Sequence, residues 1–236
     1  MRLNIKPYFD LCRVSNLPTV WTNVLAAIVL SNVPFPWSDF LILSLSLSCF
    51  YAGGMCLNDL CDVKEDRIKK SFRPLPSQRI SIKQATLFTI ALFGLALFLL
   101  LLVSYQRAFG VGLILLLLII VYDRIHKGHP SSVFLMAACR LLVFVISAMA
   151  ISGGVSAAVW VGGFVQFIYV LLLSLVARHE NHLKTGFSFP VIPMMLACIS
   201  LLDGVVMASF ISPIWLLPGL GGAVLTHFAQ KYIKGD

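Results

Sequence analysis

Long apolar stretches alternate with short polar breaks along almost the whole chain. Eight apolar segments are expected to form helices, at residues 17–33, 38–57, 84–103, 109–122, 132–151, 156–177, 189–210 and 213–230. A helix that spans the hydrocarbon core of a bilayer needs about 20 mostly apolar residues, and most of these segments approach that length. The pattern therefore predicts an all-α, polytopic membrane bundle of about eight transmembrane helices, organised as a single domain over residues 1–236.

The composition supports a multi-pass integral membrane protein and argues against a soluble domain. Hydrophobic residues make up 59% of the 236 positions and charged residues only 12%, and the mean hydropathy is +0.92. The six cysteines show no zinc-type spacing, so free thiols are expected. A soluble basic domain and a base-stacking module are both missing from the pattern, so we expect no nucleic-acid partner.

Charge placement predicts how the helices are oriented in the membrane. Of the 18 Lys and Arg residues, 16 lie in the two terminal tails and in the segments 58–83, 123–130 and 178–187. These segments share one side of the membrane if eight helices alternate. The opposite loops hold only Arg107, and Arg140 lies inside an apolar segment. Because basic loops favour the cytosolic side, both termini are expected in the cytosol.

Acidic and basic side chains are concentrated in residues 58–83, just after the second apolar segment. Asn58, Asp62 and Asp66 are four residues apart, so a helix places them on one face, and Asp59 adds an offset fourth oxygen ligand. Several bases follow, among them Arg73. Carboxylates suit Mg²⁺ and guanidinium groups suit phosphate oxygens, so the segment fits a magnesium-bridged diphosphate. A solvated charged loop would explain the bases, but it would not explain the regular spacing of the acids.

This segment resembles the first signature of the UbiA superfamily of intramembrane prenyltransferases. The family pattern is NDxxDxxxD followed by RPxxxGxIS, and the chain reads Asn58-Asp59-x-x-Asp62-x-x-x-Asp66 and then Arg73-Pro74 through Ile80-Ser81. One departure is Gln78, where the family usually has Gly. The resemblance implies a prenyl diphosphate donor, Mg²⁺ held by Asn58, Asp62 and Asp66, and stabilisation of the leaving diphosphate by Arg73 and Arg140.

The resemblance also implies a substrate pocket at the same end of the bundle. Its expected residues are Arg13, Asn16, Asn23, Tyr122, Lys127, Glu180 and Lys184. Simpler readings stay open for several of them. Asparagines at a helix start often cap the helix or join helices, and the Arg and Lys residues after residue 122 also satisfy the charge bias of the topology.

Arg140 is expected to be buried, about nine residues into its helix and therefore about 13 Å deep at 1.5 Å per residue. An arginine at that depth costs several kcal/mol unless it has an anionic or backbone partner. The family resemblance implies a catalytic role for it. A pair with Asp203, which lies in the middle of the seventh apolar segment, would be a structural alternative.

The second half of the chain carries a reduced form of the family's second acidic motif. In residues 171–186, Lys184-x-Gly186 matches the family pattern, but Glu180 is the only carboxylate. Glu180 is therefore expected to be the metal ligand of this half. His179 and His182 form either a weak metal pair or a polar loop. The short chain and reduced motif are similar to the EboC-like proteins.

Three functions compete at this point. The first is a Mg²⁺-dependent prenyltransferase that moves an isoprenyl group from a prenyl diphosphate to an aromatic or other small acceptor in the bilayer. The second is a catalytically degenerate relative that binds or transports a lipid-like metabolite. The third is an unrelated small transporter, which the intact first motif disfavours.

Overall fold

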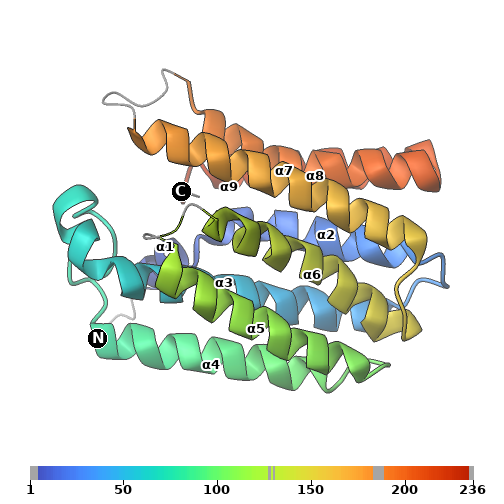
Figure 1. The fold of residues 1–236 in the computed structure, drawn as a ribbon, viewed down its shortest axis with the longest axis horizontal. Coiled ribbons are helices and arrows are strands. Elements are labelled where there is room, and N and C mark those ends of the chain that lie inside the picture. Colours follow the sequence, from blue (N-terminus) through green and yellow to red (C-terminus); the bar gives the residue numbers. More distant parts are fainter. Residues whose placement is uncertain (1–4, 127–128, 130, 183–188, 234–236) are drawn as a thin grey trace.

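The computed structural model describes residues 5–126, 129, 131–182 and 189–233, and within these ranges the fold is entirely helical (Figure 1). Nine α-helices follow one another in the described residues: α1 Lys6–Cys12, α2 Leu17–Leu30, α3 Trp37–Lys69, α4 Ile82–Leu100, α5 Arg107–Ile125, α6 Ser132–Ser152, α7 Ala157–His182, α8 Val191–Phe210 and α9 Leu216–Ala229. Short 3₁₀ turns at Val14–Asn16 and Pro213–Trp215 lead into α2 and α9.

Helices α2 to α9 coincide with the eight apolar segments, so the predicted membrane bundle is confirmed. Six of them, α3 to α8, are long and apolar enough to cross a bilayer, whereas α2 and α9 have only 14 residues each. The protein is a multi-pass integral membrane protein. Helix α1 was not predicted, because its seven residues are too few to show a hydrophobic period, although Pro7, Leu11 and Cys12 are buried.

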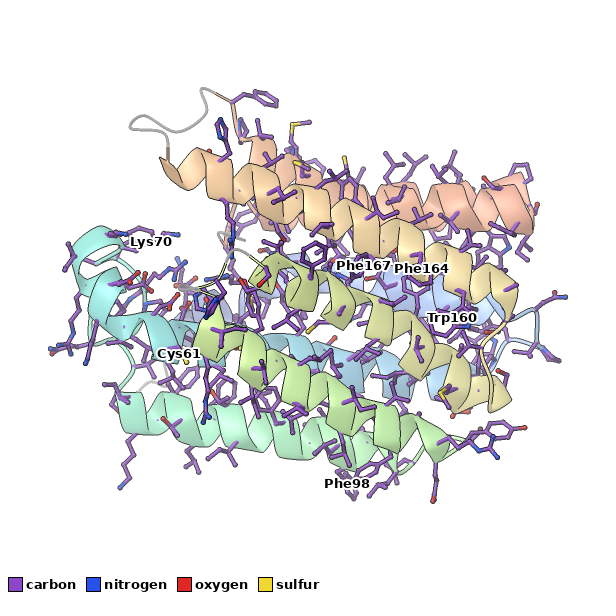
Figure 2. All side chains as sticks on the ribbon, in the orientation of Figure 1. Cys61, Lys70, Phe98, Trp160, Phe164 and Phe167 are labelled. Carbon is purple, nitrogen blue, oxygen red and sulfur yellow. The ribbon has the colours of Figure 1, made fainter. Side chains whose placement is uncertain are left out.

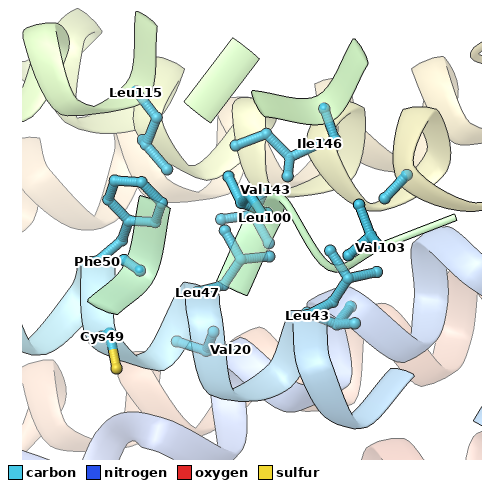
Figure 3. Packing of buried hydrophobic residues seen from close by; sticks show 14 of the residues in the cluster. Val20, Leu43, Leu47, Cys49, Phe50, Leu100, Val103, Leu115, Val143 and Ile146 are labelled. Carbon is cyan, nitrogen blue, oxygen red and sulfur yellow. The ribbon is translucent and has the colours of Figure 1, made fainter. Parts of the chain in front are cut away.

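Apolar side chains both fill the bundle and cover its outside. Leu43, Leu47 and Phe50 of α3 pack with residues of α4, α5 and α6, including Leu100, Leu115 and Ile146, in the largest buried cluster (Figure 3). On the outer surface Phe98, Trp160 and Phe164 remain 56%, 40% and 50% exposed (Figure 2). Large exposed apolar side chains of this kind are expected where a protein contacts lipid.

Glycines allow two close helix contacts that position the interior. At Gly53 an added Cβ would come within 2.7 Å of the Phe93 ring, so this glycine lets α4 pack tightly on α3. Gly204 of α8 and Gly219 of α9 meet backbone to backbone, because a Cβ on Gly219 would lie 2.6 Å from the Gly204 Cα. Close crossings through small residues are a common way of joining membrane helices.

The charged segments gather at one end of the bundle. The ends of α3, α5, α7 and α9 lie together with α1 at the left of Figure 1. The connections at residues 101–106 and 153–156 lie at the other end. The chain end after α9 is tied to the start of α2, since Gln230 Nε2 donates to Asn16 Oδ1 over 3.0 Å. This charged end is where the predicted site residues converge.

Candidate active site

The acidic motif lies in the last turns of α3, which continues as one helix through Lys69. Arg73 folds back onto this helix and bridges two of its acids. Its Nη1 donates to Asp66 Oδ2 at 2.7 Å and to Asp59 Oδ1 at 3.1 Å, and all three side chains are at most about 10% exposed. Arg73 therefore fixes the turn after α3 against the motif.

Arg13 makes the second contact to Asp59 from the other side. Its Nη2 donates to Asp59 Oδ1 at 3.1 Å, and its Nη1 lies 3.3 Å from Met55 Sδ. The backbone of Arg13 is left-handed, with φ of 47°, because α1 ends here and the chain turns into the next short helix. An unfavourable backbone conformation held in place by an ion pair is a common feature of functional sites.

The turn between α3 and α4 contains Gln78, the one departure from the family pattern. Gln78 has φ of 58°, a left-handed conformation that glycine adopts without steric cost. Ser77 Oγ donates to the Arg73 carbonyl at 2.6 Å, and Ser81 and Gln84 form a capping box that starts α4. The turn is thus formed by local hydrogen bonds, and Gln78 keeps its geometry at some cost in strain.

Asp62 faces the end of α5. Its Oδ1 lies 3.5 Å from Nε2 of His126, the residue that caps α5. The hydrogen bond to Asp62 is the main reason why the pKa of His126 is raised above 6.5. The His126 ring is stacked on Tyr122, with 5.3 Å between the ring centroids. The His126 imidazole therefore lies where its protonated form would neutralise part of the charge on Asp62.

Asn58 connects the motif to a carboxylate on α5. Its Nδ2 donates to Asp123 Oδ1 over 3.1 Å. Asp123 is only 4% exposed, and its Oδ2 has no hydrogen-bond partner among the described residues. The site at the end of α3 therefore includes a buried carboxyl side chain that the motif does not predict.

Five of the predicted site residues line one internal chamber of about 200 Å³: Arg13, Asn16, Asn58, Tyr122 and Arg140. Asp123 and Tyr51 add two more polar side chains, and Asn16 Nδ2 donates to the Tyr51 hydroxyl at 3.1 Å. The remaining walls are apolar residues of α2, α3 and α5 to α8, for example Leu47, Leu173 and Ile199. The chamber therefore has a polar end beside the acidic motif and an otherwise apolar interior.

Arg140 is held inside the bundle by a hydrogen-bonded network. Its Nη1 donates to Asn23 Oδ1 at 2.8 Å and its Nη2 to Thr19 Oγ1 at 3.2 Å. Asn23 Nδ2 in turn donates to both carboxylate oxygens of Asp203, at 2.9 and 2.7 Å. Arg140 and Asp203 are therefore linked through Asn23, and among the described residues no direct salt bridge joins them.

Asp203 also accepts from Gln166 Nε2 at 2.7 Å, so the network connects α2, α6, α7 and α8. Asp203 is fully buried and Gln166 is 1% exposed. Buried polar groups of this kind are stable only when they are hydrogen-bonded. The structural alternative for Arg140 is thus partly right, but Arg140 still reaches the chamber wall and can contact a ligand there.

The remaining predicted residues lie outside the chamber lining. Asp62, Asp66 and Arg73 are at its charged end, and Asn23 lies behind Arg140. Glu180 is half-buried near the end of α7. Lys127 and Lys184 fall outside the described residues, so their predicted roles stay predictions.

Sequence reasoning missed Tyr51, Thr19 and Asp123 as site residues. Tyr51 could have been found, because it precedes Asn58 by seven residues and so lies two turns back on the same helix face. Asp123 directly follows the predicted Tyr122, but it falls outside both acidic motifs. Thr19 gave no signal, since a threonine at a helix start is common.

The donor set fits Mg²⁺ when diphosphate oxygens complete it. Among the described residues no group of three or more His, Cys, Asp and Glu side chains forms a ready-made metal cage. Mg²⁺ usually uses one or two carboxylates, several waters and substrate phosphates. Asp62, the Asp123 carboxylate and the Asn58 amide supply oxygens at the polar end of the chamber, so these residues match that requirement.

A multi-pass helical bundle with a carboxylate-rich polar end on an internal apolar chamber has the architecture of an intramembrane enzyme for amphiphilic substrates. A sequence model of the UbiA prenyltransferase family matches residues 18–234. The chain belongs to the UbiA prenyltransferase family, which confirms the class of enzyme that the first motif predicts. Whether it falls in the EboC-like branch stays a prediction.

Curated relatives of the chain include archaeal digeranylgeranylglyceryl phosphate synthases. The protein of Sulfolobus acidocaldarius is 30% identical over 178 residues, which cover 73% of this chain and 61% of that protein. The protein of Methanococcus vannielii is 41% identical over 97 residues, or 39% of this chain and 35% of that protein. The chain thus spans between about one third and three fifths of the length of these relatives.

Solved structures share the fold at low sequence identity. A structure of digeranylgeranylglyceryl phosphate synthase aligns with a TM-score of 0.63 at 20% identity, over 98% of this chain and 93% of that chain. A UbiA homologue from Archaeoglobus fulgidus, bound to DMAPP and Mg²⁺, aligns with a TM-score of 0.58 at 19% identity, over 97% and 88%. These similarities establish the UbiA fold.

Proposed function

We propose that the protein is a Mg²⁺-dependent prenyltransferase that moves an isoprenyl group from a prenyl diphosphate to a small acceptor within the bilayer. The observation that carries the proposal is the chamber, whose polar end holds Asn58, Arg13 and Asp123 and whose walls are otherwise mostly apolar. An amphiphilic donor needs this combination, with its diphosphate at the charged end and its prenyl chain along the apolar walls.

Some side chains bind the metal and the diphosphate, and others exclude water from the reacting carbon. Asn58, Asp62 and Asp66 hold the metal in this proposal, and bound Mg²⁺ neutralises the charge of the leaving diphosphate. Arg13 provides guanidinium N–H groups at the polar end, where they bind phosphate oxygens. Arg73 keeps the motif in position through its contacts to Asp59 and Asp66. The apolar walls exclude water while the donor carbon carries positive charge.

Arg140 is proposed to orient the acceptor. It lies on the chamber wall, its position is fixed by Asn23 and Thr19, and it can donate hydrogen bonds to a polar group inside an apolar space. A site of this kind suits an acceptor with an oxygen or an anionic group on an apolar body. The relatives are named for a product with two geranylgeranyl groups on a glyceryl phosphate, so a prenylated glyceryl phosphate is an acceptor class to test beside aromatic ones.

The test uses the purified full-length protein in detergent. Radiolabelled prenyl diphosphates of five, ten and twenty carbons are offered with each acceptor class, and release of diphosphate is measured with and without Mg²⁺. Mg²⁺-dependent consumption of a donor supports the proposal. No consumption of any donor under these conditions would contradict it.

The alternative is a non-catalytic relative that binds or transports a lipid-like metabolite. The reduced acidic motif on α7, where Glu180 is the only carboxylate of residues 171–186, favours this alternative. It predicts saturable binding of a prenyl diphosphate without release of diphosphate, and the same experiment measures both.

We also propose that both termini face the cytosol, since 16 of 18 Lys and Arg residues belong to that side. Reporter fusions at residue 107 and at residue 236 should then report opposite sides of the membrane, because α5 to α9 lie between them. Matching signals would contradict this topology.

A further inference from the structure

Among the described residues, Asp123 is the only carboxylate that lines the chamber, and it lies outside the first motif. It is 4% exposed and lies two residues before the end of α5. It therefore reaches the chamber from a different helix than the motif residues of α3. Its Oδ1 accepts from Asn58 Nδ2, and its Oδ2 has no hydrogen-bond partner in the described part of the chain. A buried carboxylate oxygen without a donor is costly unless a cation or proton compensates it.

Among the described residues, the two basic side chains His126 and Arg13 near Asp123 have other partners. His126, three residues further on, lies 3.5 Å from Asp62, and its Nδ1 lies 3.1 Å from the Asp123 carbonyl rather than its carboxylate. Arg13 is hydrogen-bonded to Asp59. Asp62 thus contacts the His126 ring, and Asn58 of the same motif is hydrogen-bonded to the Asp123 carboxylate. Two carboxylates around one polar chamber end match what a hard divalent cation requires.

We infer that Asp123 is a metal-ligating residue, which supplies from α5 a carboxylate ligand outside the first motif for the divalent cation held by Asn58, Asp62 and Asp66. The inference rests on the proposed function, since it concerns the same diphosphate site. It assigns the carboxylate ligand outside the first motif to α5, whereas the family resemblance places such a ligand on α7 at Glu180.

Metal affinity is the direct test, and it does not depend on turnover. Mn²⁺ replaces Mg²⁺ because free Mn²⁺ gives a paramagnetic resonance signal that disappears on binding, and inorganic pyrophosphate provides the diphosphate without a reactive prenyl group. Asp123→Asn should weaken Mn²⁺ binding about tenfold or more, the scale on which changes at a metal site act. Asp39→Asn is the matched control, because Asp39 is also buried (6% exposed) but binds Ser104, in the 101–106 connection at the opposite end.

Thermal unfolding separates a ligand from a purely structural residue. If Asp123 is a ligand, Asp123→Asn should unfold at the wild-type temperature or above it without metal, and it should lose most of the stabilisation that Mn²⁺ with pyrophosphate gives to the wild type. Asp123→Ser, which also removes the charge, should behave in the same way and covers the case in which the asparagine variant fails to fold.

Two results would overturn the inference, and they differ in what else they affect. If the wild type binds Mn²⁺ with pyrophosphate and both variants bind it equally well, Asp123 is not a ligand, while the proposed function stands. If the wild type itself does not bind Mn²⁺ with pyrophosphate, the metal-dependent function fails together with the inference.

Discussion

The last turns of α3 and the last turns of α7 reach the same end of the bundle (Figure 1), but their charged side chains have different partners. On α3, Asp59 and Asp66 are bound by arginines, and Asn58 reaches across to Asp123 beside the chamber. On α7, Arg178 donates to the carbonyls of His126 and His129 at 3.2 and 3.3 Å and to Ser132 Oγ at 2.7 Å. The end of α3 thus faces a ligand space, while the end of α7 holds a neighbouring turn.

The acidic side chains of the first motif thus lie on α3, while the end of α7 contributes an arginine that binds a neighbouring segment. The turn after α5 contacts both helices, because His126 binds Asp62 through its ring and Arg178 through its carbonyl. Changes on either helix therefore reach the other through His126. If the chemistry belongs to the α3 side and the α7 side only supports it, substitutions on α3 should mainly lower turnover and substitutions on α7 should mainly lower stability.

The largest effect is expected at Asp62. Asp62→Ala should lower turnover at least about a hundredfold, the scale of losing one charge-stabilising group, while leaving the fold intact. The rate of diphosphate release measures it, and circular dichroism checks the fold. Glu65→Ala is the control on the same helix, because Glu65 is exposed. Full activity of Asp62→Ala, or of the wild type in excess chelator, would show that the acidic motif of α3 does not bind a catalytic metal.

A smaller effect is expected at Glu180. If this carboxylate still serves the metal, Glu180→Gln should lower turnover and Mg²⁺ affinity by about tenfold or more. The Mg²⁺ dependence of the initial rate measures both. A variant indistinguishable from wild type would show that Glu180 has no role in metal binding or turnover, and it would sharpen the contrast between the two helix ends.

Arg178 should affect stability more than turnover. Arg178→Asp removes three hydrogen bonds and places a carboxylate beside carbonyl oxygens, so the variant should lose about 1–3 kcal/mol. At this chain length about 1 kcal/mol shifts the Tm by roughly 2–4 °C. Arg178→Lys, which keeps the charge, should lose less. Higher turnover of Arg178→Asp would instead mean that the lost acidic pair can be rebuilt.

The smallest effect concerns the strained turn beside the motif. Gln78→Gly should raise the Tm by a few degrees at most. It relieves a left-handed conformation that costs a non-glycine residue about 1–2 kcal/mol. Part of this gain is offset because glycine increases the conformational entropy of the unfolded chain. Gly153→Ala, at φ of 71° on the other end, should lower the Tm. A lower Tm for Gln78→Gly would mean that the glutamine side chain stabilises the turn.

The hydrophobic pattern was enough to predict the bundle. A segment that crosses the bilayer must form all its backbone hydrogen bonds internally, as a helix does, and its length appears in the sequence as a long apolar run. Helix α1 escaped this signal through its short length. The motif spacing predicted that Asn58, Asp62 and Asp66 share a helix face, and they do lie on one helix. Whether these residues act as proposed is for the mutants to test.

The contacts between distant segments could not be predicted from spacing. Asn58 meets Asp123 over a separation of 65 residues, and Arg140 meets Asn23 over 117. Such pairs depend on how the helices pack against one another, and the hydrophobic periodicity of a single sequence does not reveal this. Arg140 was recognised only because a charge inside an apolar segment demands a partner. The network that supplies this partner needed the three-dimensional structure.

The network around Arg140 also constrains how the protein is made. When α6 leaves the ribosome, Asn23 and Thr19 have already been synthesised, so Arg140 can be solvated by its own chain as it enters the bilayer. Asp203 follows only with α8, some sixty residues later. A nascent chain that stops before α8 would hold Arg140 in the membrane interior with amide and hydroxyl partners but without the Asp203 carboxylate. Insertion of α8 therefore supplies the carboxylate that completes the network, and a chain truncated before α8 should lack it.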